Sequence, residues 1–451
     1  MDIQAFKERV FAVGRAAGLE DMEVYMSSSK NFLVRVFKEE VDDYKASVEQ
    51  GVGFRASFAG KVGYAYVETL DEDSVQILVD GAKANAQVIE SSDEIEFFAG
   101  AENYPEVVSY NHELAAISPQ EKIAFAKDLE KEAFAADKRV SMVNWAMNGY
   151  GETEIYIANT KGLEQSFKRN GAYSYVSAVV RDGEQVKTGG RMIFANDWTK
   201  FNAKESAQEA VMEATSLLGA ASVDSGTYRV LLRFDVAGTL LQTFASVFSA
   251  EAVQKGLSLL QGKLGGQIAS PLITVVDDPL LENGAASTPF DAEGVPTQRK
   301  NVIEAGRLNT YLYNLKTAKK DGVSSTGNAS RASYKSPVGI APTNFFVQPG
   351  ESSYEELVET LGDGIVIIDV QGTHSGANTV SGDFSLSAYG YFVENGKITR
   401  PVDQITIAGN FFELLESVEA VGADLMFVNP GSAGNVGSPS LIISHLAIAG
   451  I

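Results

Sequence analysis

Apolar residues recur at helical spacing in several stretches of the chain. In the first stretch, Ile3, Phe6 and Val10 fall on one face, and Gly18 ends the pattern. The same spacing predicts later helices over residues 203–218, 235–250 and 410–421. Two more helices begin at capping signals, namely Thr69 with Glu72, and Ser118 followed by Pro119 and Glu121.

Between these helices, short runs of β-branched and aromatic residues alternate with polar or glycine-containing breaks, as is typical of strands. The order helix, strands, helix occurs in residues 1–90 and again in residues 118–219. This order is compatible with an internal duplication, although no repeat is visible residue by residue. The strands predicted in this half cover residues 23–26, 32–37, 52–57, 62–67, 139–148, 154–159, 172–181 and 185–194.

A short stretch, residues 219–226, is predicted to link two domains because it is polar, small and bounded by glycines. After it, glycine-punctuated strands dominate, and two apolar runs, 364–370 and 441–451, are predicted to be buried strands. We therefore expect an α+β protein. Its domain at 1–219 is a mixed α/β region with two helix-flanked sheets, and its domain at 227–451 is β-rich and barrel-like.

Composition narrows the classes of protein to which the chain can belong. Of its 451 residues, 45% are hydrophobic and 21% are charged, which is typical of a globular protein. The formal net charge of -22 opposes contact with a phosphate backbone, so direct binding of nucleic acid is not expected.

No apolar run approaches the length of a membrane span, and the charged N-terminus is unlike a signal peptide. We therefore expect a soluble, cytoplasmic protein without membrane contact.

The candidate chemistry is narrow as well. The chain contains no cysteine, which excludes disulfides, thiolate metal sites and cysteine nucleophiles. Its histidines, His112, His374 and His445, lie far apart in sequence, whereas zinc ligands are often paired one helical turn apart, so a zinc site is not expected. No serine lies in a G-x-S-x-G frame, and neither a P-loop nor a G-x-G-x-x-G fingerprint is present.

Residues 372–396 form the most informative segment, a dense run of small residues that leads into a predicted hairpin. Small residues let another backbone approach closely, which suits a groove for an extended peptide. Glycines also shape tight β-barrel corners, and the residues alone favour neither interpretation. A hydrolytic triad of His374, Ser375 and Asp383 is a weaker interpretation, because a turn-rich loop satisfies its own backbone with such side chains. The candidate peptide-binding residues are His374, Ser375, Gly376, Asn378, Ser381, Gly382 and Asp383.

Several motifs, this segment among them, resemble one known family. They are the segments 294–308, 325–329, 374–385 and 405–412, together with 436–441 and 447–450 near the C-terminus. In these motifs, and more loosely over most of its length, the chain resembles the TldD/PmbA family, which is long described as modulators of DNA gyrase.

The resemblance implies a division of labour between two branches of that family. TldD-like members carry a His-Glu-x-x-x-His segment and a cysteine near the C-terminus, which bind the zinc of a metalloprotease. At the matching positions this chain has Gln242, Thr243 and Val247, and it has no cysteine. The sequence therefore resembles the PmbA/TldE branch. The resemblance implies a pseudo-enzyme subunit without a cofactor of its own, paired with a TldD-like zinc peptidase in a cytoplasmic heterodimer.

The same resemblance implies that the complex degrades or matures small, extended or unfolded polypeptides. For the chain on its own, a homodimer is a further candidate state. The charge balance argues that any link to gyrase is indirect. A hypothesis from a different class is a stand-alone peptide-binding protein without a proteolytic role, which would use the loop at 372–385.

Overall fold

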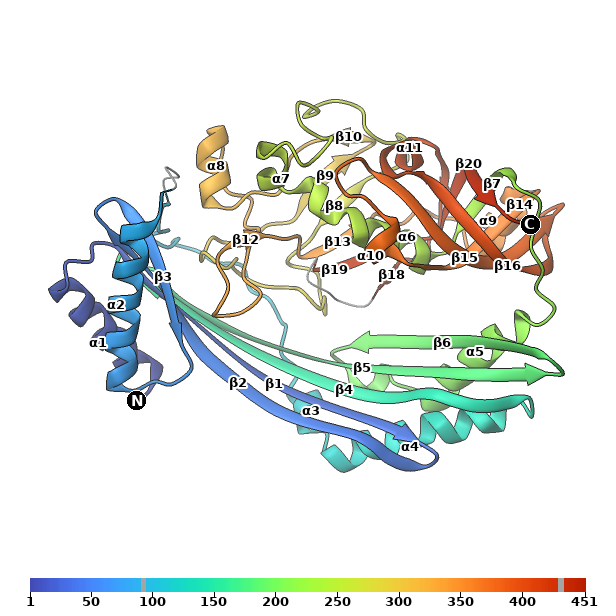
Figure 1. Cartoon of the computed structure of the whole chain (residues 1–451), viewed down its shortest axis with the longest axis horizontal. Coiled ribbons are helices and arrows are strands. Elements are labelled where there is room, and N and C mark those ends of the chain that lie inside the picture. The colour runs from blue at the N-terminus through green and yellow to red at the C-terminus, as the bar shows by residue number, and fades with distance from the viewer. Residues whose placement is uncertain (91–94, 429–433) are drawn as a thin grey trace.

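The chain folds into two parts that face each other, as a computed structural model shows for residues 1–90, 95–428 and 434–451 (Figure 1). A long curved sheet with helices on its outer side forms the N-terminal part. A barrel, accompanied by short strands and loops, forms the C-terminal part. The predicted α+β class with a barrel-like C-terminal region is confirmed.

The N-terminal sheet has six antiparallel strands in the order β3-β2-β1-β4-β5-β6. In one detail it differs from the expectation of two sheets: the two groups of strands are joined, because β1 pairs with β4 over almost its whole length. The strands are β1 (Met22–Phe37), β2 (Glu40–Phe58), β3 (Lys61–Val67), β4 (Val140–Asn159), β5 (Glu164–Asp182) and β6 (Gln185–Ala195).

Strand β1 is longer than predicted because it continues through a polar stretch. β1 runs unbroken through residues 27–31, where the sequence pattern predicts a break. Its backbone is hydrogen-bonded on both sides here, to β2 and to β4, so the strand continues although its side chains are polar. The polar stretch therefore marks a change in what the sheet faces, not the end of a strand.

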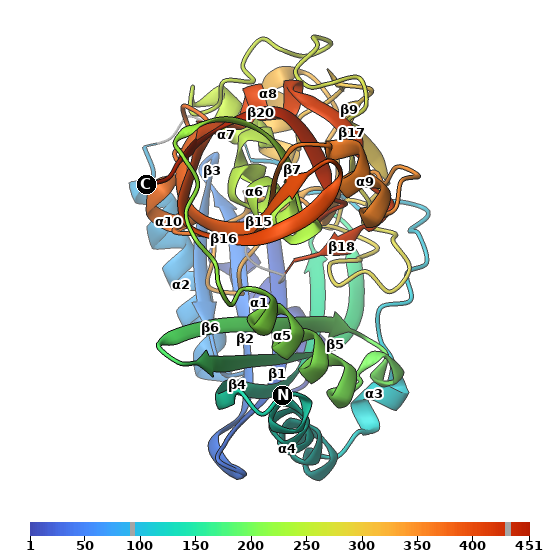
Figure 2. The ribbon, with the colours of Figure 1, turned by 90° about the vertical axis from the view of Figure 1, so that its right-hand side faces the viewer.

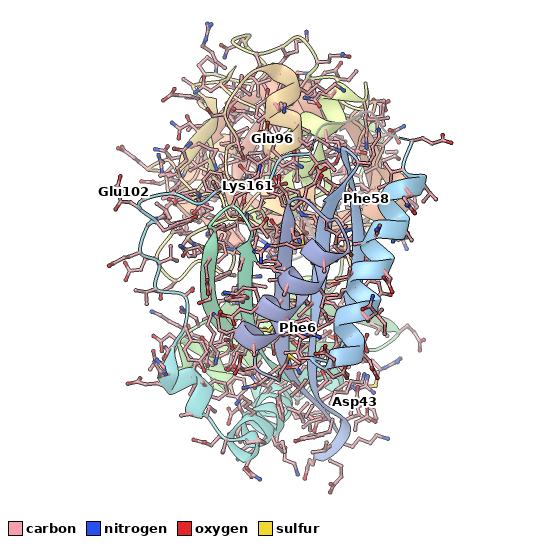
Figure 3. All side chains as sticks on the ribbon, turned by 90° about the vertical axis from the view of Figure 1, so that its left-hand side faces the viewer. Phe6, Asp43, Phe58, Glu96, Glu102 and Lys161 are labelled. Carbon is pink, nitrogen blue, oxygen red and sulfur yellow. The ribbon has the colours of Figure 1, made fainter. Side chains whose placement is uncertain are left out.

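The two faces of this sheet meet different surroundings, because side chains alternate along each strand. On β1, Met22 and Val24 pack against α1 and α2, and Figure 3 views the side that these helices cover, with Phe6 on α1. On the same face farther along, Val34 and Val36 pack against α4 and α5. The opposite, concave face is thus left for the C-terminal part. The helices are α1 (Ile3–Ala16), α2 (Glu72–Val88), α4 (Pro119–Ala136) and α5 (Ala203–Ser216).

The starts of these helices follow the predicted capping chemistry with one shift. α4 begins with a complete capping box, in which the Glu121 N–H donates to Ser118 Oγ (3.2 Å) and the Glu121 carboxylate accepts from the Ser118 N–H (2.8 Å). α2 begins later than the predicted cap at Thr69, because the Asp71 carboxylate accepts from the Ser74 N–H at 2.8 Å. Asp71 is therefore the N-cap of α2.

A polar cluster lies on the outer face between the two helical layers. The Glu152 carboxylate at its centre is 2.9 Å from Lys168 Nζ and 3.1 Å from Lys30 Nζ. The hydroxyls of Tyr110 and Tyr150 each donate to it at 3.0 Å. Burial favours the neutral acid, but these donors outweigh burial and lower the pKa of Glu152 to about 2. The ionised carboxylate therefore ties β1, β4 and β5 to the segment around Tyr110.

A five-stranded barrel forms the core of the C-terminal part. β16, β15, β14, β7 and β20 are neighbours in that order, and pairing between β16 and β20 closes the ring (Figure 2). α6 packs against it, with the Phe244 ring stacked on that of Phe411 at 4.6 Å between centroids. The bounds are β7 (Gly226–Leu232), α6 (Phe234–Phe244), β14 (Gly364–Gln371), β15 (Asp383–Glu394), β16 (Lys397–Asn410), α11 (Phe411–Glu416), β17 (Val418–Val421) and β20 (Leu441–Ala449).

A second six-stranded sheet, in the order β10-β9-β8-β13-β19-β18, shares one continuous hydrophobic core with the barrel.

No helix in the described ranges has the length and apolar character needed to cross a bilayer. The remaining elements are α3 (His112–Ala116), α7 (Ala250–Gln254), β8 (Val275–Asp277), β9 (Lys300–Glu304), β10 (Arg307–Leu308), α8 (Leu315–Asp321), β11 (Ala329–Ser330), β12 (Gly339–Ile340), β13 (Asn344–Val347), α9 (Tyr354–Leu361), α10 (Thr373–Gly376), β18 (Met426–Phe427) and β19 (Asn435–Ser438).

Two helices of this part are shorter than their patterns predict. α6 ends at Phe244, short of residue 250, and a 3-10 turn over Ala245–Phe248 follows it. α11 ends at Glu416, short of residue 421, because Val418 enters β17 and pairs with Ile443 of β20. In both places, apolar residues that fit a helical face are buried by a turn or a strand instead, so periodicity alone does not mark the end of the helix.

Glu152→Gln should destabilise the protein at neutral pH. Because the pKa of the folded carboxyl lies below its ordinary value of 4.5, its stabilising contribution is fully present above about pH 4.5 and is lost as the pH falls towards 2. We expect a loss of about 1–3 kcal/mol in the free energy of unfolding at pH 7, since a pKa unit corresponds to about 1.4 kcal/mol and both lysines are partly exposed. Urea unfolding at about pH 7, 5 and 3 measures this loss. A difference between wild type and variant that stays constant down to pH 3 would contradict it.

Candidate functional site

The concave face of the sheet and the C-terminal part enclose a hollow of about 530 Å³. A second hollow of about 480 Å³ adjoins it along the same face, and Thr153 and Arg169 line both. We call the two hollows together the central groove. Strands β1, β2, β4 and β5 form its floor, and residues within 286–292, 327–334 and 341–343 form its roof. Hollows of this size are typical of ligand sites.

The register between strands builds the floor from small and polar residues. One row across the sheet consists of Glu49, Ser29, Thr153 and Arg169, on β2, β1, β4 and β5 in turn. The next row consists of Ser47, Asn31, Gly151 and Gly171. The polar stretch of β1 is therefore polar because alternate side chains in it face the groove and not a hydrophobic core.

Glycines in the floor let aromatic rings lie close against the sheet. A Cβ atom added at Gly51 would come within 2.3 Å of the Tyr334 ring, and one at Gly171 would come within 2.7 Å of the Phe194 ring. Any larger residue at these positions would displace the ring that lies over it. The groove thus has aromatic sides above a small, polar floor.

Arg169 is a half-buried cation near the middle of the groove. Burial lowers the pKa of its guanidinium, and the nearby Tyr25 acts in the opposite direction. Within the described part of the chain, no carboxylate lies within 4.0 Å of this guanidinium. Its neighbour Lys168, which points to the other face of the sheet, is bound to Glu152. Arg169 therefore offers hydrogen-bond donors to the groove.

Two glutamates and two arginines are buried beside the groove, and we call Glu23, Arg55, Glu293 and Arg331 the charge lock. Arg55 donates to both oxygens of Glu23, at 2.9 and 2.8 Å, and to Glu293 Oε1 at 3.3 Å. Arg331 also donates to Glu23. Burial alone would raise the pKa of Glu23, but the two arginines outweigh it and lower that pKa. The charge lock joins β1 and β2 to the C-terminal part with balanced charge.

Arg331 borders the groove but is closed off from it, because its side chain has no exposed surface. The Arg331 guanidinium lies 4.4 Å from the centre of the Tyr25 ring, and its Nε and Nη1 atoms are buried without a hydrogen-bond partner. A guanidinium over an aromatic face is attracted by the ring, which compensates in part for the missing hydrogen bonds. Of the two arginines that line the groove, Arg169 is therefore the one within reach of a ligand.

Asp291 in the roof has a structural task. Its carboxylate accepts hydrogen bonds from the backbone N–H groups of Glu293 (2.8 Å), Val295 (3.0 Å) and Ala329 (3.0 Å). Burial, and next the Glu293 carboxylate, raise the pKa of Asp291, while the N–H groups act against this rise. With its oxygens engaged in this way, Asp291 shapes the roof by holding residues 291–295 against β11.

The loop that the sequence singles out lies elsewhere, around α10, and none of its seven candidate residues lines the groove. Ser375 Oγ donates to the Gly372 carbonyl at 3.4 Å, and Asp383 accepts from Asn410 Nδ2 at 2.9 Å. His374 is exposed. The hydrogen bonds of His374, Ser375 and Asp383 thus do not join any two of the three.

The other residues of the loop make its turn. Asn378 Oδ1 accepts from the N–H groups of Val380 (2.9 Å) and Ser381 (3.2 Å). A Cβ atom at Gly376 would come within 2.3 Å of the Ser385 carbonyl, and Gly382 has a φ of +83°. The small residues therefore serve the close approach to β15, as a barrel corner requires. Peptide binding by this loop stays a prediction.

The positions that match the zinc motif are built into the fold in other ways. Thr243 Oγ1 donates to the Thr239 carbonyl one helical turn earlier, at 2.7 Å, and Val247 lies in the hydrophobic core with 1% exposure. Gln242 is half-buried on α6. Among the described residues, no three His, Asp or Glu side chains gather in a way that could hold a metal. These residues do not fit a zinc ion.

A curved sheet and a barrel that enclose a polar groove define a two-part α+β protein with a ligand-sized site between its parts. Three family models match the chain in order: PmbA/TldA metallopeptidase domain 1 over residues 22–86, the central domain over 112–218, and the C-terminal domain over 225–450. The chain belongs to the PmbA/TldD metallopeptidase family. The family resemblance in the sequence motifs is thereby confirmed.

Relatives from both branches are about equally similar to the chain. A metalloprotease TldD homologue of Haemophilus influenzae is 30% identical over 433 residues, which cover 89% of this chain and 87% of the relative. A metalloprotease PmbA homologue of the same organism is 28% identical over 436 residues, which cover 95% and 92%. Overall identity therefore does not separate the two branches.

Solved structures share the fold over the full length. A Thermotoga maritima protein described as a modulator of a DNA gyrase is 36% identical to the chain, with a TM-score of 0.90 over 99% of this chain and 100% of that one. TldE from Thermococcus kodakarensis also has a TM-score of 0.90 over 99% and 100%, at 22% identity. The second likeness shows that the fold is shared.

Sequence reasoning did not find the residues that build the groove and the charge lock. One local signal was present, because Glu23 stands between Met22 and Val24 in an apolar strand, where a charge needs a partner. Its partner Arg331 is 308 residues away along the chain, and no sequence pattern connects them. Arg169 carries no local signal at all, since its position in a hollow depends on the roof.

Glu23→Gln should destabilise the protein strongly, because the buried Arg331 would lose its carboxylate partner and Arg55 would keep only Glu293. We expect a loss of about 3–5 kcal/mol in the free energy of unfolding, as for other buried pairs with one partner removed. Glu49→Gln is the matched control, since it makes the same change at an exposed position on the same face of the sheet and should stay within about 0.5 kcal/mol. Chemical unfolding midpoints compare the two variants, and equal losses would contradict the role of the charge lock.

Proposed function

We propose that this chain is a PmbA/TldE-like subunit of a heteromeric, cytoplasmic zinc metallopeptidase, and that a TldD-like partner carries the zinc. In this proposal the complex degrades or matures small, unfolded polypeptides. The chain contributes no metal ligand and no general base, so it acts as a pseudo-enzyme subunit that binds peptide and completes the site of its partner.

One observation carries the proposal: the chain belongs to a family of metallopeptidases, yet its residues at the zinc-motif positions cannot form the site. Zinc in a catalytic site needs three protein ligands, usually histidine or carboxylate, and a general base beside its water. Gln242 offers an amide, the Thr243 hydroxyl is bonded to its own helix, and Val247 has no ligand atom. Since all of these positions depart from the motif, the chemistry is expected on another chain.

The central groove supports a part for this chain in holding the substrate. An extended polypeptide needs a long, open site with polar and aromatic walls, and the groove offers such walls along the concave face of the sheet. The net charge of -22 disfavours nucleic acid as the ligand. The proposal therefore assigns the family's link to gyrase to protein substrates and not to DNA.

Reconstitution tests the proposal. We expect that this chain alone, and the TldD-like subunit of the same organism alone, hydrolyse fluorescein-labelled casein at background rates, and that their mixture is active at least about tenfold above either. Removal of zinc with a chelator should abolish the activity of the mixture, because the zinc of the partner would activate the water that attacks the peptide bond. The control mixture contains a TldD-like subunit with the first histidine of its zinc motif replaced, and it should be inactive.

Two results would contradict the proposal. One is turnover by this chain alone that a chelator removes, and the other is full activity of the TldD-like subunit without this chain. Peptide binding by this chain together with the second result would favour the stand-alone peptide-binding protein, either as a monomer or as a homodimer.

A further inference from the structure

We propose that the central groove binds the carboxylate of an extended peptide through Arg169. The inference rests on the proposed function only for the peptidic nature of the ligand. The recognition of a carboxylate is argued from the groove itself, and it adds a specificity to the site that the proposed function does not contain.

The first step is the charge of Arg169. Its guanidinium is half-buried, lines both hollows and has no described carboxylate within 4.0 Å. Arginine cannot lose its proton in proteins, so burial leaves a permanent cation without a counter-charge. Because no described carboxylate competes for it, an anion in the groove can pair with it directly through charge-assisted hydrogen bonds. The guanidinium fork matches a carboxylate in geometry and can donate two hydrogen bonds to it.

The second step is what surrounds that cation. Tyr25, Ser29 and Thr153, which carry hydroxyl groups, line the same hollow, and Thr153 is the cross-strand neighbour of Arg169. Hydroxyl groups donate hydrogen bonds to carboxylate oxygens that a guanidinium leaves free. Lys45 is the other groove-lining cation with an exposed side chain, and its Nζ is 3.0 Å from the Asp43 carboxylate. The attraction for an anion is therefore centred on Arg169.

The third step concerns the number of negative charges on the ligand. Glu49 stands in the same cross-strand row as Arg169, three strands away, which corresponds to about 14 Å. A polyanion along this row would bring further negative charges towards Glu49, whereas a peptide places one carboxylate at Arg169 and neutral backbone beyond it. About four extended residues cover that distance. The charge pattern thus favours a peptide with a single carboxylate over nucleic acid or polyphosphate.

The carboxylate could be the C-terminal α-carboxylate of the peptide or the side chain of an aspartate or glutamate. Both present the same planar pair of oxygens to the guanidinium. The aromatic rings of Tyr173 and Phe194 line the groove on one side of Arg169, and that of Tyr334 lines it on the other. An internal aspartate could therefore be held with chain on both sides, and a C-terminus with chain on one.

Fluorescence anisotropy with the isolated chain tests the inference. The probes are a fluorescein-labelled octapeptide of alanine, leucine and serine as the free acid, the same peptide as the C-terminal amide, and an amidated version with one internal aspartate. We expect wild type to bind the free acid, the aspartate peptide or both at least about tenfold more tightly than the neutral amide, as is usual for charge-assisted hydrogen bonds. Which of the two binds identifies the source of the carboxylate.

The variants separate Arg169 from a general effect of charge. Arg169→Gln should remove the preference for the carboxylate peptides, while Arg15→Gln, which removes an exposed charge at the end of α1, should keep it. Arg169→Lys keeps the charge without the fork and should retain only part of the preference. If Arg169→Gln does not fold, as judged by circular dichroism, Arg169→Lys decides.

Two results would overturn the inference: equal binding of the neutral amide and both carboxylate peptides by wild type, or an unchanged preference in the Arg169 variants. Neither depends on reconstitution. If the preference depends on Arg169 but the chain is dispensable for peptidase activity, the proposed function fails and this inference stands. If the mixture with the TldD-like subunit is an active peptidase but this chain shows no preference for carboxylate peptides, this inference fails and the proposed function stands.

Discussion

The charge lock is the interaction on which the arrangement of the two parts depends. Glu23 and Arg55 come from the sheet, and Glu293 and Arg331 come from the C-terminal part, and all four are buried. Two positive and two negative charges balance, and two of the ion pairs, Arg331 with Glu23 and Arg55 with Glu293, cross between the parts. A shift of one part against the other that still excluded water would leave buried charges without partners, at a cost of several kcal/mol. This constraint fixes the roof at one height over the floor, and with it the width of the groove.

A second constraint follows from the alternation of side chains along the strands. Helices α1, α2, α4 and α5 cover one face of the sheet with apolar contacts, so the same strands can carry small and polar residues on the other face without losing their core. One sheet thereby serves two purposes. Its outer face supplies stability through packing, and its concave face supplies the floor of a site. The glycines of the floor, such as Gly51, leave room for the rings that form the sides of the groove.

Much of the fold could be predicted from local signals, and the site could not. The capping box at Ser118 and the buried strand at 364–370 rest on residues close in sequence, and both hold in the structure. The polar stretch of β1 misled the prediction, because an open groove and a chain break look alike in sequence. Arg169 and Arg331 matter only through residues far away along the chain, which no periodicity encodes. The zinc-motif positions were visible only through the family resemblance, since Val247 by itself is an ordinary core residue.

The chain belongs to a metallopeptidase family, and we propose that it leaves the metal to its partner. The most direct measurement is the zinc content of this chain purified alone, without chelators, beside that of the complex with a TldD-like subunit. The account predicts a value near zero for the chain alone and zinc in the complex only. A value near one per chain for the protein alone would contradict the account, since distant residues, His374 among them, would then have to build a metal site that the described structure does not contain.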